Sequence, residues 1–341
     1  MELVITGLFV GVLFGFVLQR GRFCMNSAFR DIVLFKDYAL LKTVAAAVLV
    51  SLAGFAIMDL AGVITLAPKP LWWGANILGS FVFGIGMVIA GGCASGITYR
   101  VGEGMVGAMT AVLGLTIGAY VTALGFLSGF KTSLQESTKI VAADGSSLTL
   151  ANILGIDYAV FALVIFVVVV VIWFILGWKK YEGDNKWGWL TTGFLIGLVA
   201  IIAWPLSAAA GRNYPLGITA GWIGIAKKLL NLTNSEVQLN WIAWLIIGTV
   251  VGSFIAALIA RELKLRVPPI KRLLITFGGG LLMGFGAVLS GGCNITHILS
   301  GVPQLSLGSF LAGISIILGA WLMSYIMFVL PMKKAEAESE E

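Results

Sequence analysis

Apolar residues fill this chain in long stretches, without the short amphipathic periods of a soluble protein. A helix needs about 20 mostly apolar residues to cross the hydrocarbon core of a bilayer. Stretches of this kind occur at 3–19, 39–63, 71–90, 104–128, 152–178, 189–205, 240–261, 273–290 and 306–330. We therefore predict an all-α polytopic membrane protein with nine transmembrane helices.

Four further apolar segments are too short to cross a bilayer. They lie at 23–30, 93–99, 293–300 and, before the seventh predicted span, 217–230. Segments of this length in a membrane protein are read as re-entrant or interfacial helices, which are tolerated where protein surrounds them. We predict a short helix at each.

Two of these short segments follow the same phrase, 200 residues apart. It reads GIGMVIAGGC from Gly84 to Cys93 and GFGAVLSGGC from Gly284 to Cys293. A weaker likeness links the stretches 7–11 (GLFVG) and 193–197 (GFLIG). The chain is therefore predicted to be an internal duplication.

The predicted halves are residues 1–130 and 189–331, with 131–188 as a linker that carries the fifth span and 332–341 as an acidic tail. Five spans separate the two starts, and an odd number inverts the second half. This 4+1+4 inverted repeat is the plan of many transporters, whose site lies near the midplane between the repeats.

Basic residues give the expected orientation. Of the 22 Lys and Arg residues, 16 lie in the tail and in the loops after odd-numbered spans, and 6 lie on the other side. The positive-inside rule then places the C-terminus in the cytoplasm and the N-terminus outside. The glutamate-rich end is expected to be solvated.

Composition excludes several classes of function. The chain is 59% hydrophobic and 11% charged, and its net charge of +6 is explained by loop residues, so no nucleic-acid partner is expected. It has neither a phosphate-binding loop nor a dinucleotide fingerprint, and no signal peptide is expected. None of its three cysteines lies in a CxxC pair, so we predict no metal and no cofactor.

The Gly-Gly pairs mark the expected site. Glycine allows the backbone to break a helix and lets a ligand approach it, and the N-terminus of the next helix attracts anions without a costly buried cation. The expected substrate path comprises Cys24, Cys93, Cys293, Gly91, Gly92, Gly291, Gly292, Ser95, Thr98, Asn294, Thr296 and His297. Arg22 and Arg212 are candidates for an exit and an entrance, and His297, the single histidine, for a hydrogen-bonded or proton-relay role.

The cysteines limit the kinds of ligand that we expect at this site. Its S–H is a weak donor and its sulfur is soft, so serine would serve an all-oxygen anion better. Thiols at three points of one path favour a ligand that contains sulfur or selenium, or a soft metal.

The segment Gln19 to Cys24 (QRGRFC), together with the two Gly-Gly-Cys breaks, resembles the YeeE/YedE family over nearly the whole chain. The resemblance implies an inner-membrane importer of thiosulfate, in which Cys24, Cys93 and Cys293 pass the ion inward by transient S–H···S contacts. Other members are associated with selenium or with general sulfur transport. The resemblance also implies membrane lipid as surroundings and a separate cytoplasmic partner, either a TusA-like sulfur carrier or a rhodanese-like protein.

Two other classes stay open on the sequence. A membrane sulfurtransferase or thiol oxidoreductase would use Cys93 and Cys293 covalently, with His297 as the nearest base. A Cu(I) or other soft-metal transporter would show loops rich in Met, Cys or His, for which Met25 alone is weak support.

Overall fold

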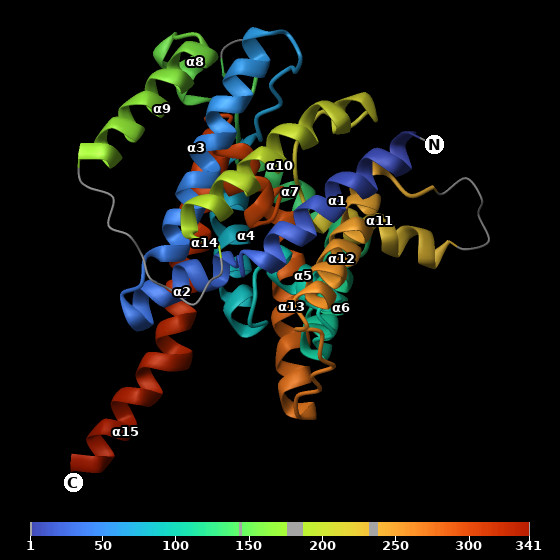
Figure 1. Cartoon of the computed structure of the whole chain (residues 1–341), viewed down its shortest axis with the longest axis vertical. Helices are drawn as coiled ribbons and strands as arrows, with labels where there is room; N and C mark the ends of the chain where they lie inside the picture. The colour runs from blue at the N-terminus through green and yellow to red at the C-terminus, as the bar shows by residue number, and fades with distance from the viewer. Residues whose placement is uncertain (1, 143–144, 176–186, 232–237, 341) are drawn as a thin grey trace.

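The computed structural model of the chain describes residues 2–142, 145–175, 187–231 and 238–340. Figure 1 shows a helical bundle from which the C-terminal helix projects. The helices are α1 (Glu2–Arg20), α2 (Met25–Phe35), α3 (Ala39–Leu60), α4 (Trp73–Ile89), α5 (Ala94–Gly102), α6 (Val106–Leu124), α7 (Ser128–Ser137), α8 (Leu150–Leu154), α9 (Tyr158–Ile175), α10 (Trp189–Ala209), α11 (Thr219–Leu230), α12 (Trp241–Ile259), α13 (Ile270–Ser290), η1 (Ile295–Gly301), α14 (Leu307–Ser324), η2 (Tyr325–Val329) and α15 (Leu330–Glu340), where η1 and η2 are π-helices. Two short strands, β1 (Leu71–Trp72) and β2 (Lys139–Ile140), pair antiparallel.

The predicted spans and short helices are confirmed. In the described part of the chain, nine helical segments are long and apolar enough to cross a membrane, so this is a multi-pass α-helical membrane protein. The short segments form α2, α5, α11 and η1. The predicted end of the fifth span, at 178, lies outside the described residues.

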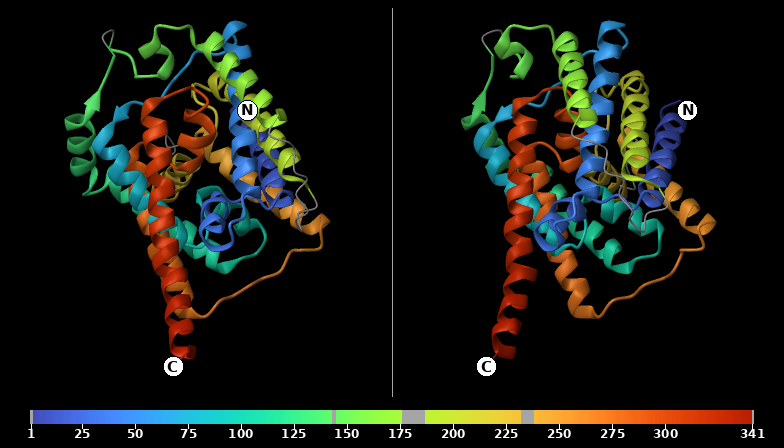
Figure 2. Two further views of the ribbon diagram at one scale, coloured as in Figure 1. Left: turned by 90° about the vertical axis from the view of Figure 1, so that its left-hand side faces the viewer. Right: turned by 60° about the vertical axis from the view of Figure 1, so that its left-hand side comes forward.

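Some features of the structure were not predicted. Strand β1 precedes the third span, α7 and β2 follow the fourth, and α8 precedes the fifth. The acidic tail is not an extended chain: as α15 it continues the ninth span through η2, and Figure 2 shows the rod extending beyond the bundle. The side chains of α15 as far as Ser339 are exposed, which agrees with the expected solvation.

The helices before and after α9 pack in matching pairs. Helix α1 packs on α12 as α10 packs on α3, and α6 packs on α13 as α14 packs on α4. The short helices follow the same scheme, since α5 contacts α12 and η1 contacts α3. Contacts between α4 and α13 connect the α14–α4 pair to the α6–α13 pair, and contacts between α1 and α10 connect the α1–α12 pair to the α10–α3 pair.

Helices α4 and α13 cross with glycine at the closest points. A Cβ atom added to Gly79 would lie 2.7 Å from the oxygen of Gly286. One added to Gly86 would lie 2.7 Å from the oxygen of Gly279. The two helices therefore touch backbone to backbone, as small residues allow in membranes. This crossing fixes the ends of α4 and α13, where the Gly-Gly pairs lie.

Helix α9 stands at the edge of the bundle. Its most extensive contacts are with α3, and valine side chains along it are exposed. A helix that is apolar all round and exposed is suited to lipid contact.

Candidate functional site

Both Gly-Gly pairs end a helix in the left-handed conformation. Gly91 follows α4 with φ +75°, and Gly291 is the C-cap of α13 with φ +88°. An L side chain would be strained at either position, whereas glycine is not. Each helix therefore stops there, and the chain turns into α5 after Cys93 and into η1 after Cys293.

Side chains from elsewhere satisfy the carbonyl groups that these breaks leave free. Nη1 of Arg100 donates to the Gly91 oxygen at 2.8 Å. Nδ2 of Asn76 donates to the Ser290 oxygen at 2.8 Å, and Gln135 on α7 donates to two carbonyls in the last turn of α13. Unpaired carbonyls are costly in a membrane, so the breaks are built into the fold.

Cys24 and Cys93 lie in contact. Their Sγ atoms are 3.7 Å apart and both residues are buried. Each is the N-cap of a short helix, and Sγ of Cys93 accepts the N–H of Gly96 at 3.3 Å. The hydroxyl of Ser95 lies 3.5 Å from the same sulfur. The structure thus brings three of the predicted site residues together at the start of α5.

Cys293 occupies the matching position before η1 and is also buried. Its Sγ lies 3.6 Å from Oγ1 of Thr296. All three cysteines are free thiols, and among the described residues no sulfur contact joins Cys293 to Cys24 or Cys93. Cys93 is therefore in contact with Cys24 and, within the described part of the chain, not with Cys293.

A polar residue beside Cys293 reaches the first half. Nδ2 of Asn294 donates to Sδ of Met25, the residue after Cys24, at 3.0 Å. The other amide atom of Asn294, Oδ1, is buried without a partner among the described residues. Oδ1 of Asn26, next to Met25, is buried in the same way. Buried acceptors in folded proteins are normally paired with a hydrogen-bond donor, so these two amide oxygens are unusual.

His297 has a hydrogen-bond partner at only one of its two ring nitrogens. Its Nδ1 lies 3.2 Å from Oγ of Ser309, whereas Nε2 is buried without a partner in the described part of the chain. Gly292 lies beside the unpaired nitrogen, since a Cβ there would be 3.3 Å from it. The first of the two predicted roles, a hydrogen-bonded histidine, thus describes one ring nitrogen only.

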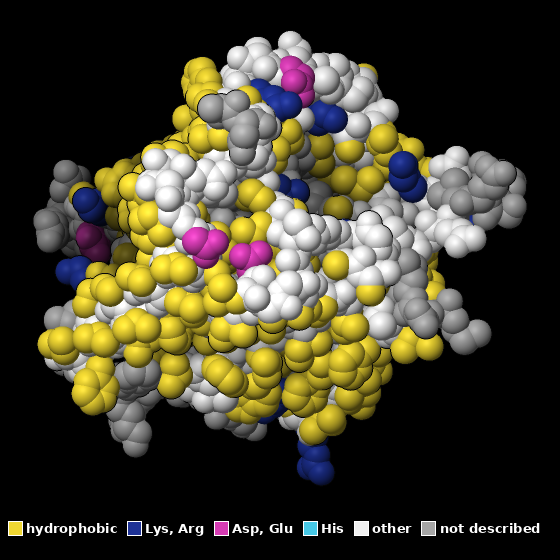
Figure 3. Space-filling view, turned by 90° about the horizontal axis from the view of Figure 1, so that it is seen from above, with side chains coloured by type: hydrophobic (Ala, Val, Ile, Leu, Met, Phe, Trp, Pro, Cys, Tyr) yellow, Lys and Arg dark blue, Asp and Glu magenta, His cyan; other side chains and the backbone are white. Residues whose placement is uncertain are grey.

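A pocket of about 220 Å³ opens against Gly291 and Gly292, and we call it the Gly291 pocket. Lys69, Arg212 and Thr296 form part of its wall. Figure 3 shows that one face of the molecule is hollowed, with Lys or Arg side chains inside the hollow. Thr296 also contacts Cys293, so one residue of the pocket wall touches a thiol.

The cations of this pocket have no carboxylate partner among the described residues. Nζ of Lys69 lies 4.5 Å from the centre of the Tyr214 ring, and Nη1 of Arg212 donates to the Pro215 oxygen at 3.0 Å. Burial, with the Arg212 charge second, lowers the pKa of Lys69 to about 8. Burial lowers the pKa of Arg212 to about 10. Two basic side chains thus lie beside a helix break at which the sequence predicted an anion site without them.

Thr98 has its hydroxyl engaged on both sides. It donates to the Ala94 oxygen at 2.8 Å and accepts from Nε1 of Trp222 on α11 at 3.1 Å. Thr98 thus anchors α11 to α5, and its hydroxyl is committed to that contact.

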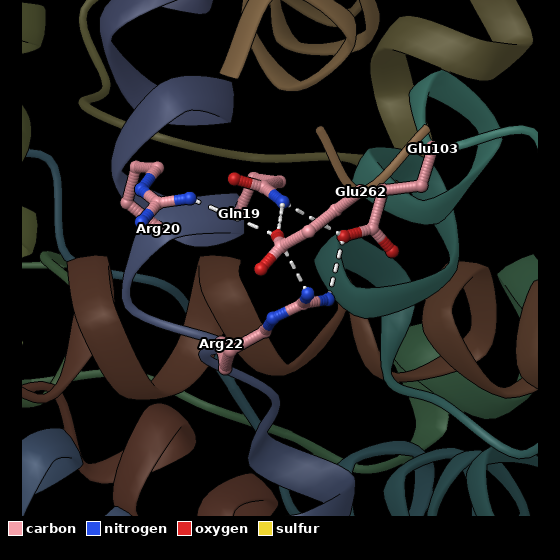
Figure 4. A network of polar contacts seen from close by, with 5 residues as sticks. All are labelled: Gln19, Arg20, Arg22, Glu103 and Glu262. Carbon is pink, nitrogen blue, oxygen red and sulfur yellow. Dashed lines mark hydrogen bonds and ion pairs between the residues drawn. The ribbon is translucent and has the colours of Figure 1, made fainter. Parts of the chain in front are cut away.

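Arg22 is part of a network of charges and amides (Figure 4). It has a positive φ of 50°, and its guanidinium pairs with Glu103 at 2.8 Å and Glu262 at 2.7 Å. Gln19 donates to both carboxylates, and Arg20 lies 3.7 Å from Glu262. The candidate exit charge is therefore neutralised, in contrast to Arg212.

Sequence reasoning missed Lys69, Met25 and Trp222. Lys69 lies between two prolines on the side that is poor in basic residues, and that position was a usable signal. Met25 follows Cys24 directly, but nothing in the sequence placed it beside Asn294. Among the described residues, no group of three or more His, Cys, Asp and Glu residues is arranged to hold a metal ion.

Helix breaks paired across a bundle of spanning helices, with a cationic pocket at one of them, are features of the membrane transport proteins. Residues 20–322 match the family described as sulphur transport, and the chain belongs to that family. It is therefore a transporter.

Two curated relatives extend over almost the whole chain. One, from Spirochaeta thermophila, is named thiosulfate transporter TsuA and is 45% identical over 332 residues, which cover 95% of this chain and 98% of the relative. Another of the same name, from Escherichia coli, is 32% identical and covers 98% of this chain and 97% of the relative. The probable transporter YedE of Salmonella typhimurium is 37% identical over 115 residues, 33% of this chain and 28% of the relative.

Proposed function

We propose that this protein imports thiosulfate. Two relatives that match almost end to end carry that activity in their names. The observation that carries the proposal in this chain is the connection between the Gly291 pocket and a thiol: Thr296 lines the pocket and lies 3.6 Å from Sγ of Cys293. An anion drawn in by Lys69 and Arg212 would present its terminal sulfur to Cys293.

The path then runs from Cys293 past Asn294 and Met25 to the Cys24–Cys93 pair. The contact of 3.0 Å between Asn294 and Met25 supports this order, because it joins the segment after the second helix break to the start of α2, next to Cys24. Thiols and a thioether are soft donors and acceptors that suit a ligand with a terminal sulfur.

The Gly291 pocket faces the outside in this proposal, and the N-terminus is outside with the C-terminus in the cytoplasm. The distribution of basic residues supports that orientation in a bacterial inner membrane. Residues 1–130 and 189–331 form the inverted halves, and the matching helix pairs support this division. Their site between the halves follows the general plan of such transporters.

Uptake of a dianion against an inside-negative potential costs about 4.6 kcal/mol per 100 mV. No nucleotide-binding motif in the sequence would meet that cost. The protein therefore acts as a facilitator, and a cytoplasmic sulfur carrier of the TusA type or a rhodanese-like protein removes the imported sulfur. Lipid surrounds the bundle, above all along α9.

The test is uptake of labelled thiosulfate by liposomes that contain only this protein. We expect saturable equilibration, with a lower equilibrium level under an inside-negative potential. Concentrative uptake driven by a proton or sodium gradient would replace the facilitator with a symporter. If protein-containing and empty liposomes take up thiosulfate equally, the proposed function is wrong.

A further inference from the structure

A second pocket lies against the other helix break. It has a volume of about 410 Å³, and Gly91, Ile97, Arg100, Arg266 and Arg272 form part of its wall. We call it the Gly91 pocket. It borders the first Gly-Gly pair as the Gly291 pocket borders the second, and the two pairs are 200 residues apart in the duplicated phrase.

Three arginines line this pocket, and no Asp or Glu is among the described residues of its wall. In the described part of the chain, Arg100, Arg266 and Arg272 form no ion pair. The nearby acids Glu103 and Glu262 are engaged with Arg22. The pocket therefore carries net positive charge, and guanidinium groups bind the oxygens of tetrahedral anions in a bidentate manner.

The three arginines are held to different degrees. Arg100 donates to the Gly91 oxygen at 2.8 Å, and Nη2 of Arg272 would lie 3.4 Å from a Cβ atom at Gly91. The backbone of Arg266 is bonded to Gly104 and Val106 at 3.1 Å each, whereas the residue is exposed. Arg100 is therefore tied to the helix break itself, with Arg272 beside it.

The pocket also adjoins the thiol pair. Ile97 forms part of its wall, is 1% exposed, and follows Cys93 by one turn of α5, with its N–H bonded to the Cys93 oxygen at 2.8 Å. A single apolar side chain of α5 thus belongs both to the wall of the pocket and to the turn that carries Cys93.

We propose that the Gly91 pocket is a second anion-binding site, which takes the oxygen end of a divalent sulfur oxyanion after its sulfur leaves Cys93. The inference rests on the proposed function and adds the site from which the anion is released. The phosphate of an anionic lipid has the same chemistry as a ligand, but the pocket's place beside the thiol pair favours the transported anion.

The experiment measures thiosulfate uptake from each face separately, in right-side-out and inside-out vesicles that contain the full chain. For the double variant Arg266→Gln, Arg272→Gln, we expect the KM at the face of the Gly91 pocket to rise about tenfold, since charge-assisted hydrogen bonds are lost. The KM at the opposite face should stay within about twofold of wild type. Lys271→Gln is the matched control, because Lys271 is an exposed neighbour on α13 and does not line the pocket.

Arg272→Lys keeps the positive charge but loses the bidentate geometry of the guanidinium group. We expect an intermediate KM for this variant. Such a graded effect indicates weaker binding, whereas misfolding would abolish uptake. A wild-type KM for the double variant at the Gly91 face would overturn the inference while wild-type transport still stands. Absence of wild-type transport from either face would instead refute the proposed function. Liposomes of phosphatidylcholine alone test the lipid: if the effect of the double variant disappears there, the arginines hold a lipid headgroup and the inference is wrong.

Discussion

Asn294 donates a hydrogen bond from its side-chain amide to the sulfur of Met25, across 3.0 Å and between the two predicted halves of the chain. Met25 follows Cys24, and Asn294 follows Cys293, so the bond joins the neighbours of two thiols that do not touch each other. A thioether is a weak acceptor. The bond is therefore suited to being exchanged for a stronger contact with a passing anion.

Replacement of the break cysteines should stop transport. We expect Cys93→Ala and Cys293→Ala each to abolish growth on thiosulfate as sole sulfur source, and Cys24→Ala to slow it. The reason is that each break presents one thiol, whereas Cys24 supplements Cys93 at 3.7 Å. Growth is measured in a strain without other thiosulfate uptake, with expression checked by immunoblot. Normal growth of both break variants would remove the thiols from the mechanism.

Serine at the same positions should lower selectivity as well as rate. Serine keeps a donor but loses soft sulfur. Sulfate, with the same charge and similar shape, should compete poorly with thiosulfate in the wild type and better in Cys93→Ser and Cys293→Ser. Competition assays with labelled thiosulfate measure this. Equal inhibition by sulfate in wild type and variants would show that the sulfur atoms do not discriminate.

Gly96 leaves the space in which the thiol pair lies. A Cβ there would be 2.8 Å from Sγ of Cys24 and 3.1 Å from Sγ of Cys93. Alanine usually favours a helix by about 1 kcal/mol over glycine, so a loss in Gly96→Ala must come from this crowding. We expect uptake to fall about tenfold or more. Gly278→Ala is the control, since nothing lies within 4 Å of its Cβ position; similar losses in both would point to a general helix effect.

External pH should act through Lys69. Its pKa is lowered to about 8, so the amine carries its charge below that pH and loses it above. Thiosulfate remains a dianion throughout, and the pKa of Arg212, at about 10, keeps that residue charged longer. The uptake KM should therefore rise severalfold as external pH increases through about 8. Lys69→Arg should flatten the profile, because arginine stays charged; an unchanged slope in that variant would exclude Lys69.

The network around Arg22 should contribute stability. In Arg22→Gln the Glu103 carboxylate, with a side chain 7% exposed, loses its cation. The Arg22 side chain is 40% exposed, so we expect a loss of only about 1–2 kcal/mol in the free energy of unfolding. Denaturant titration of the purified protein in detergent measures it. Lys334→Gln removes a surface pair with Glu338 and should cost little, and an equal effect of the two changes would refute the role of the network.

The sequence predicted the spans and short helices well, because their signals are local. Apolar length identifies a spanning helix, and the glycine pairs at 91–92 and 291–292 mark helix ends by their backbone freedom. The partners of side chains could not be predicted in this way. Cys93 meets Cys24 because α2 and α5 begin at the same point in space, and Arg22 loses its free charge to Glu262, 240 residues away. Such contacts depend on packing between distant segments.

The crossing of α4 and α13 limits how this transporter can work. The two helices have glycine at 79, 86, 279 and 286, and backbone atoms of the partner helix lie where side chains would be. No space is left between the two main chains at these points. Sliding or rocking would force rigid main chains through each other, so we expect the frame to stay fixed during a transport cycle. Movement is then left to small parts: side chains such as Met25 and Asn294, and the first turns of α5 and η1. The anion would then pass between fixed sites through small side-chain movements, without a large rotation of one half of the protein against the other.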